Sequence, residues 1–203
     1  MTAPAYRDSR LLPPARIAHR EVGYWAMVLF CITEAMLFAY LLSSYFYLGV
    51  SNAFWPPAGV ERPTLEKPLF MTACLVSSSI VLFFSERARE RGNKSRYLIG
   101  LVVTILLGLG FLVLMGLEYR EKLQHMPPRA HAYASIFYLI TGFHGSHVAF
   151  GLLMLCWTGF ADLRGRLSVE SPLAVKNSAF YWHFVDAVWI VILTCLYLSP
   201  RWY

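Results

Sequence analysis

Five long apolar runs dominate this chain and restrict what it can fold into. They occupy residues 23–48, 68–86, 97–117, 133–160 and 179–199. A helix needs roughly 20 apolar residues to cross the hydrocarbon core of a bilayer, and it pairs all its backbone polar groups internally. The runs are too long and too uniformly apolar for the strands of a membrane barrel. The sequence therefore predicts an all-α integral membrane bundle of five transmembrane helices in residues 23–203, after a polar tail in residues 1–22.

The charged residues gather between the apolar runs. Only 15% of the 203 residues are charged, against about 25% in soluble domains. Twelve of the 18 Lys and Arg residues precede the first run or lie in the second and fourth connections, and six lie on the other side. The positive-inside rule then predicts a cytoplasmic N-terminus and a C-terminus outside. We interpret the basic run at 87–96 as a topology and lipid-headgroup anchor, and we expect no nucleic-acid partner.

Ionisable side chains inside a span are costly, so each one is a functional candidate. Glu34 lies near mid-bilayer in the first run, where only a partner or protonation makes a carboxyl tolerable. His144 and His147 lie in the stretch TGFHGSHVAFG and share one helix face. From the residues alone, this pair suits structural hydrogen bonds, a proton or ligand pathway, or a metal or haem site with a further ligand from another helix.

The fifth run carries a second polar face. His183 and Asp186 are three residues apart, and Trp182 and Trp189 follow the same seam at a spacing of seven. A carboxylate can orient an imidazole by accepting its N–H, which suits a metal ligand, a proton relay or a contact between helices. Glu118 lies at the outer end of the third run, where we expect it to be solvated at the membrane interface.

The motifs resemble one family, subunit III of the haem-copper terminal oxidases of the cytochrome c oxidase type. The matching stretches lie in the family's order within residues 23–199: MVLFCITEAMLFAYLLSSYFYL, FWPPAGVERPTLEKPLFMTACLVSSS, LEYRE, YLITGFHGSHVAFGLLML and FYWHFVDAVWIVILTCLYLSP. The chain is similar to the short, five-helix form, which lacks the first two helices of the seven-helix form.

The resemblance implies a non-catalytic subunit with no cofactor or metal of its own. Haem and copper would lie in partner subunits, with subunit I as the main contact, subunit II nearby, and bound phospholipid. It also implies support for proton uptake during oxygen reduction. Glu34 corresponds to the family's intramembrane glutamate, which reacts with carbodiimides. His144, His147, His183 and Asp186 correspond to pattern residues that serve packing and hydrogen bonding, so we expect both histidines of the fourth run to be hydrogen-bonded within the bundle.

Several alternatives stay open at this stage. A quinol oxidase uses a closely similar third subunit, and a related short protein accompanies some nitric oxide reductases. A different class of function is a stand-alone proton channel built on Glu34, His144, His147 and Asp186. For the oxidase subunit, we expect a multi-pass location in the cytoplasmic (inner) membrane of a prokaryote.

Overall fold

The described residues form five long helices, as the apolar runs predicted. The computed structural model describes residues 15–52, 54–57, 60, 64–167 and 173–201. The helices are α1 (Ala15–Val50), α2 (Glu66–Glu90), α3 (Lys94–His125), α4 (Ala132–Leu163) and α5 (Leu173–Ile192). The last helix continues as a π-helix, η2 (Leu193–Leu198), and a 3-10 turn, η3 (Ser199–Arg201). Each of the five is long and apolar enough to cross a membrane, the first from Val22, so the chain is a multi-pass membrane protein.

Local sequence explains where the helices begin and end. The Asn93 side chain accepts a hydrogen bond from the backbone N–H of Arg96 and so caps α3, and His131 caps α4 through the N–H of Ala134. Gly92 and Gly165 follow α2 and α4 with φ of 78° and 67°, a left-handed conformation that favours glycine at the end of a helix.

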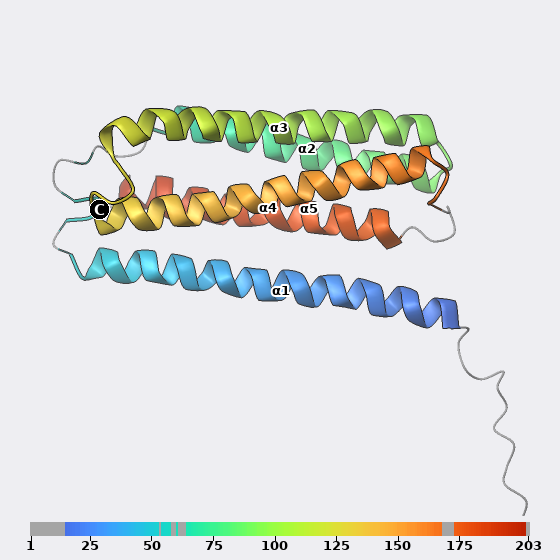
Figure 1. Cartoon of the computed structure of the whole chain (residues 1–203), viewed down its shortest axis with the longest axis horizontal. Coiled ribbons are helices and arrows are strands. Elements are labelled where there is room, and N and C mark those ends of the chain that lie inside the picture. The colour runs from blue at the N-terminus through green and yellow to red at the C-terminus, as the bar shows by residue number, and fades with distance from the viewer. Residues whose placement is uncertain (1–14, 53, 58–59, 61–63, 168–172, 202–203) are drawn as a thin grey trace, which may run out of the picture.

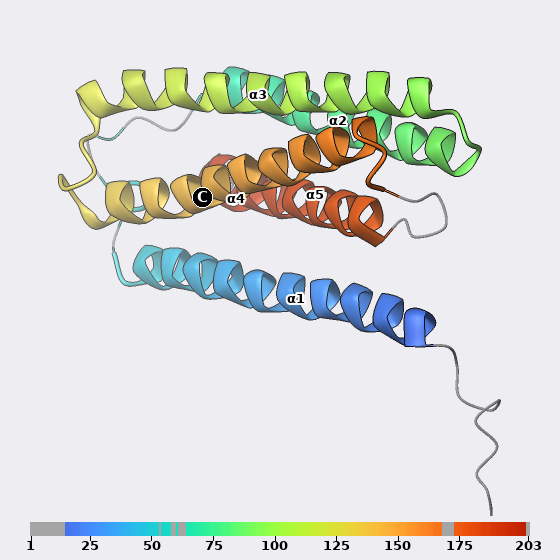
Figure 2. The same ribbon diagram turned by 45° about the vertical axis from the view of Figure 1, so that its right-hand side comes forward.

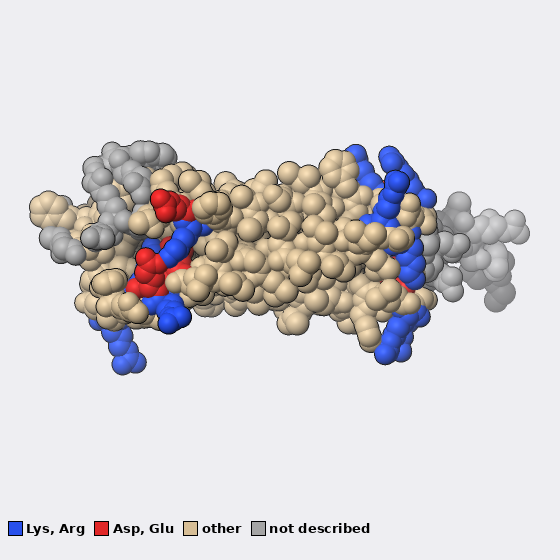
Figure 3. Space-filling model, turned by 90° about the horizontal axis from the view of Figure 1, so that it is seen from above, with Lys and Arg blue, Asp and Glu red and all other residues tan. Residues whose placement is uncertain are grey.

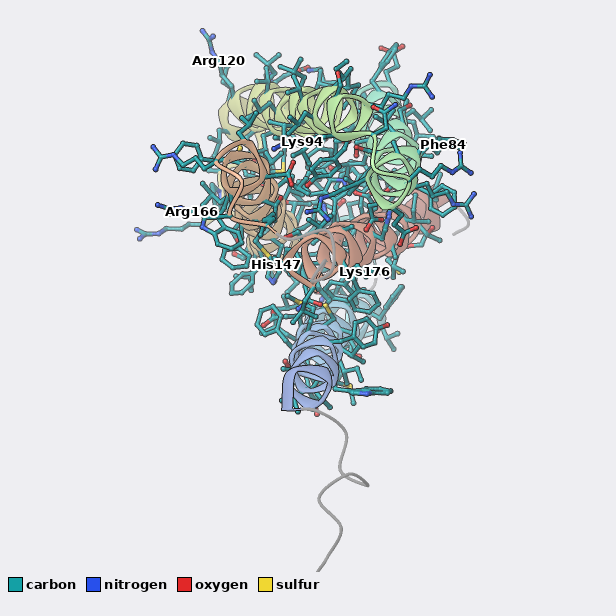
Figure 4. The ribbon with its side chains drawn as sticks, turned by 90° about the vertical axis from the view of Figure 1, so that its right-hand side faces the viewer. Phe84, Lys94, Arg120, His147, Arg166 and Lys176 are labelled. Carbon is teal, nitrogen blue, oxygen red and sulfur yellow. The ribbon has the colours of Figure 1, made fainter. Side chains whose placement is uncertain are left out.

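The helices form three layers. α2 packs against α3, α4 packs beside α5, and α1 lies alone on the far side of the α4–α5 layer (Figures 1 and 2). The view along the helices shows the same grouping, with α1 set apart from the other four (Figure 4). The helix α1 therefore depends on contacts with α4 and α5 for its position.

On the face drawn in Figure 3, the Lys, Arg, Asp and Glu side chains gather at the two ends of the bundle. A broad middle band on this face shows neither Lys and Arg nor Asp and Glu, which is the pattern expected where lipid tails surround a protein. The beginning of α1 and the α2–α3 and α4–α5 connections lie at one end (Figure 1). These segments carry the majority of the Lys and Arg residues, so the predicted cytoplasmic side corresponds to one end of the bundle.

The core is built around a large side chain between close backbones. Trp182 on α5 is fully buried, and it lies against Gly108 of α3 and Gly151 of α4. A Cβ atom at Gly108 would lie 2.6 Å from the Trp182 ring, and one at Gly151 would lie 2.9 Å from it. These two glycines therefore make room for the indole, in keeping with the use of small residues where membrane helices approach closely.

Candidate functional site

Glu34 and His147 meet across the contact between α1 and α4. The Oε2 atom of Glu34 lies 2.9 Å from Nε2 of His147, and the two side chains are 22% and 12% exposed. The other ring nitrogen of His147, Nδ1, lies 2.7 Å from the backbone carbonyl of Phe143. In Figure 4, His147 lies on the side of the four-helix group that faces α1. The intramembrane carboxyl thus has a partner, on a helix more than a hundred residues away in the sequence.

The hydrogen bonds define the protonation of this pair. A carbonyl oxygen only accepts, so Nδ1 of His147 must carry a proton and donate it to Phe143. One further proton then lies between Nε2 and Glu34, either on the carboxyl or on the ring. Both arrangements leave the pair with zero net charge, which avoids the cost of an uncompensated charge at membrane depth.

The second polar face joins α5 to α2 through a serine. The Ser79 hydroxyl lies 2.9 Å from Nδ1 of His183 and donates a hydrogen bond to Oδ2 of Asp186. With that proton committed to Asp186, the hydroxyl accepts from the Nδ1–H of His183. The carboxylate therefore orients the imidazole through a bridging hydroxyl rather than directly. Asp186 is buried, and its Oδ1 atom has no hydrogen-bond partner among the described residues.

Both tryptophans of α5 reinforce the contact with α2. The indole N–H of Trp182 donates to the Ser78 hydroxyl, and that of Trp189 donates to the Thr72 hydroxyl, each at 2.9 Å. Trp182 and Trp189 are both buried. The polar seam between α5 and α2 therefore extends over about two helical turns, from Thr72 to the Ser79 bridge.

His144 differs from what we expected. Its side chain is fully buried, yet neither ring nitrogen has a hydrogen-bond partner among the described residues. The ring stacks on Trp189 at a centroid distance of 5.1 Å and meets Phe111 and Phe38 edge-on at 5.6 and 6.3 Å. Among the described residues, aromatic rings from three other helices therefore surround His144, and the expected hydrogen bond stays a prediction.

Glu118 also differs from its predicted environment. We expected a solvated carboxylate, but the residue is 3% exposed. Its Oε1 atom lies 3.0 Å from Nζ of Lys122, and the Tyr197 hydroxyl donates to its carboxylate oxygens at 3.2 and 3.3 Å. The Lys122 ammonium lies over the Phe137 ring at 4.5 Å. Tyr197 belongs to the π-helix η2, so the irregular end of the fifth helix supplies one partner of this buried ion pair.

A third buried ionic contact was missed by the sequence analysis. Arg89, which we assigned to a lipid-headgroup anchor, is buried, and its Nη2 atom lies 3.1 Å from Oδ1 of Asp162 on α4. Lys94 donates to the backbone carbonyl of Asp162 at 2.5 Å. The available signal was Asp162 itself, an acidic residue at the end of an apolar run. Arg89 therefore joins two helices, whereas the neighbouring Arg91 is exposed.

An open pocket of about 370 Å³ lies among α1, α4 and α5, lined by Met27, Leu153, Met154, Trp157, Ala174, Asn177 and Ser178. Its lining is mainly apolar, with Asn177 and Ser178 as the polar members. Within the described ranges, no three His, Cys, Asp or Glu side chains gather closely enough to hold a metal ion.

Comparison with known proteins places these features in a family. The fold and the contacts described above define the class of this chain. It is a polytopic membrane protein whose helices are joined by carboxyl–imidazole and ionic contacts. The family Cytochrome c oxidase subunit III matches residues 17–202. The chain is 33% identical over 179 residues to cytochrome c oxidase subunit 3 of Arabidopsis thaliana, covering 85% of this chain and 67% of that protein. It is 36% identical over 193 residues to the Artemia franciscana protein of the same name, covering 90% and 71%.

The chain belongs to the cytochrome c oxidase subunit III family. The resemblance drawn from the sequence motifs is thereby confirmed. The match includes Glu34, His144, His147, His183 and Asp186, all of which lie within residues 17–202.

Proposed function

We propose that this chain is the non-catalytic subunit III of a respiratory haem-copper oxidase, which stabilises subunit I, holds phospholipid and supports proton uptake during oxygen reduction. The family match over residues 17–202 carries the proposal. Haem and copper then belong to the partner subunits I and II. We further propose that the complex lies in the inner membrane of a prokaryote. In that membrane, the positive-inside rule directs the Lys- and Arg-rich end of the bundle to the cytoplasm.

Two polar clusters support a structural role over a stand-alone channel. One joins α1 to α4 through Glu34 and His147, and the other joins α2 to α5 through Ser79 and Asp186. A channel needs a continuous line of polar groups from one membrane surface to the other. His144, which would have to contribute to such a line, is instead surrounded by Phe38, Phe111 and Trp189.

We assign the phospholipid to the apolar pocket among α1, α4 and α5. A lining of Met, Leu and Trp side chains suits an acyl chain, because burying apolar surface is favourable and makes no hydrogen-bonding demand. An Ala174→Phe substitution fills this pocket. Leu106→Phe on α3 is the matched control, because Leu106 is 61% exposed and lies outside the pocket. We expect fewer co-purified phospholipids per chain for Ala174→Phe alone, and equal lipid content in both variants refutes the assignment.

The experiment that tests the main proposal is affinity purification of the tagged chain from its native membrane in mild detergent. Haem-copper bands in the reduced-minus-oxidised spectrum, arriving with larger subunits and vanishing when the chain is purified alone, support it. Haem retained by the isolated chain, or a colourless chain without large partners, refutes it.

The same preparation identifies the type of oxidase. Recovery of a subunit II with copper ligands and turnover with cytochrome c is the expected result. Turnover with quinol, or co-purification with a nitric oxide reductase, assigns the chain to one of the two related complexes instead.

A further inference from the structure

The fifth helix carries two parallel lines of side chains, one buried and one facing outward. The buried line alternates steps of three and four residues: Ala179, Trp182, Asp186, Trp189 and Leu193. The outward line repeats the same steps one residue further along, and none of its members is buried: Phe180, His183, Ala187, Ile190 and Thr194. Steps of three and four residues are typical of a line along which another helix packs. The helix α5 thus has a second packing line on the outside of the bundle.

His183 occupies the middle of the outward line at membrane depth. It lies roughly 15 Å along the helix from Leu173, at about 1.5 Å per residue. Its ring is partly exposed and is joined through the Ser79 hydroxyl to Asp186. Ionisable side chains at this depth almost always face the interior of a bundle or a polar cavity. Here the large apolar ring of Trp182 faces inward, and the imidazole of the next residue faces outward.

The helix α1 leaves most of this outward line open. Figure 4 shows α1 and α2 on different sides of α5. The Asn177 side chain donates a hydrogen bond to the Gly23 carbonyl of α1, and Tyr24 of α1 meets the Phe180 ring at a centroid distance of 5.9 Å. Both contacts lie near the beginning of α5. Further along, Ile190 is 42% exposed.

The open surface continues from α5 onto α2. Val76 and Phe83 lie about one turn before and after Ser79, and they are 41% and 42% exposed. Ser79 itself is partly exposed and joins the two helices by its bonds to α5. The name α2–α5 outer face is used below for Val76, Ser79, Phe83, His183, Ala187 and Ile190.

We propose that the α2–α5 outer face binds a transmembrane helix of subunit I, and that this helix brings a hydroxyl or amide side chain to His183. The inference rests on the function proposed above, which supplies subunit I as the membrane partner. Nδ1 of His183 is engaged with Ser79, which leaves Nε2 for the partner. Hydroxyl and amide groups both donate and accept hydrogen bonds. Either one therefore pairs with Nε2 in both protonation states of the ring and adds no charge at membrane depth.

A helix fits this face better than lipid for two reasons. Acyl chains form no hydrogen bonds, so a lipid cover leaves a partly exposed imidazole in hydrocarbon, where polar groups are costly. A helix can satisfy the ring and still bury the apolar members of the face. Ala187 lies one turn beyond His183 and is exposed, and a small residue at such a point lets a second backbone approach closely.

The test blocks the face without changing the polar cluster. Ala187→Trp places a large ring on an exposed position, so the fold of the chain should tolerate it while a docked helix should not. Leu106→Trp is the matched control, because Leu106 is 61% exposed near the middle of α3. Tagged variants present in the native membrane in equal amounts are purified in mild detergent, and subunit I recovered per chain is measured. In parallel, a benzoylphenylalanine photo-crosslinker is incorporated at position 187 or 106.

We expect Ala187→Trp to reduce the recovered subunit I by about tenfold or more, a loss within reach of one blocked contact at the centre of an interface. Leu106→Trp should recover as much subunit I as the unsubstituted chain. The crosslinker at position 187 should label a transmembrane segment of subunit I, and the one at position 106 should not. His183→Leu should lower the recovery, and His183→Gln, which keeps a group that donates and accepts, should restore part of it.

Equal recovery of subunit I from Ala187→Trp and Leu106→Trp overturns the proposal. So does a crosslink from position 187 only to lipid or to a second copy of this chain. If the unsubstituted chain recovers no haem-copper subunit at all, the proposed function fails together with this inference. That result differs from a failure of the face alone, in which subunit I is recovered with every variant.

Discussion

Replacing Glu34 tests whether the contact between α1 and α4 rests on hydrogen bonding or on charge. In Glu34→Gln, the amide N–H can donate to Nε2 of His147 across the same 2.9 Å contact, because the other ring nitrogen keeps its proton for the Phe143 carbonyl. The hydrogen bond is preserved, so we expect a loss of less than about 1 kcal/mol of stability.

Glu34→Ala removes the same hydrogen bond and leaves Nε2 of His147 without a partner in a largely shielded position. An unsatisfied buried acceptor costs about 1–3 kcal/mol, and single hydrogen bonds between membrane helices contribute about 0.6 kcal/mol on average and about 1.7 kcal/mol at most. We therefore expect a loss of about 2 kcal/mol. For a chain of this length, that corresponds to roughly 4–8 °C in the unfolding midpoint.

The assay is thermal unfolding of the purified chain in mild detergent, with retention of the chain in the complex as a second readout. Glu121→Gln is the control, because Glu121 is exposed at the membrane end and pairs with Lys67 on the surface. A double-mutant cycle with His147→Ala should give a coupling of about 1 kcal/mol or more. If Glu34→Gln destabilises as much as Glu34→Ala, the pair depends on ionic attraction and the reasoning from hydrogen bonding is wrong.

The remaining predictions concern other buried polar groups. Arg89→Ala leaves Asp162 without its main partner and should cost about 3–5 kcal/mol of stability in thermal unfolding. Lys176→Ala, which breaks an exposed pair, should cost less than about 1 kcal/mol. Similar losses in the two variants would contradict the importance of burial. His144→Phe should be neutral or stabilising, because it replaces an imidazole whose two nitrogens lack partners by a phenyl ring that packs beside Phe38 and Phe111. A loss of stability above about 2 kcal/mol would show that the imidazole makes a hydrogen bond. Asp186→Ala should reduce co-purification with subunit I more than Arg91→Ala does, and equal retention after mild-detergent purification would count against a role of the α5 polar face in assembly.

The five membrane helices could be predicted from the sequence because their signal is local. Each apolar run had to be longer than the hydrocarbon core is thick, and no other part of the chain was needed to recognise it. The shared face of Trp182 and Trp189 was equally local, since a spacing of seven residues returns to the same side of a helix. Glu34 and His147 were also identifiable as costly groups in need of partners.

The partners themselves were decided by packing between helices. Arg89 and Arg91 lie two residues apart in one basic run, yet Arg89 is buried against Asp162 and Arg91 is exposed. Glu118 and Glu121 lie one turn apart, yet the first is buried against Tyr197 and the second is at the surface. Composition cannot separate such neighbours at a helix end, because hydropathy there no longer indicates which side faces protein.

His144 and His147 show the same division within three residues. Helical spacing placed both imidazoles on one side of the helix, but the roughly 60° between them around the axis directs one toward Glu34 of α1 and the other into the rings of Phe111 and Trp189. Local sequence determines which residues form membrane helices and which of them carry polar groups. The tertiary structure decides which polar groups are paired, because pairing depends on how closely the helices approach and on which side each helix turns toward its neighbours.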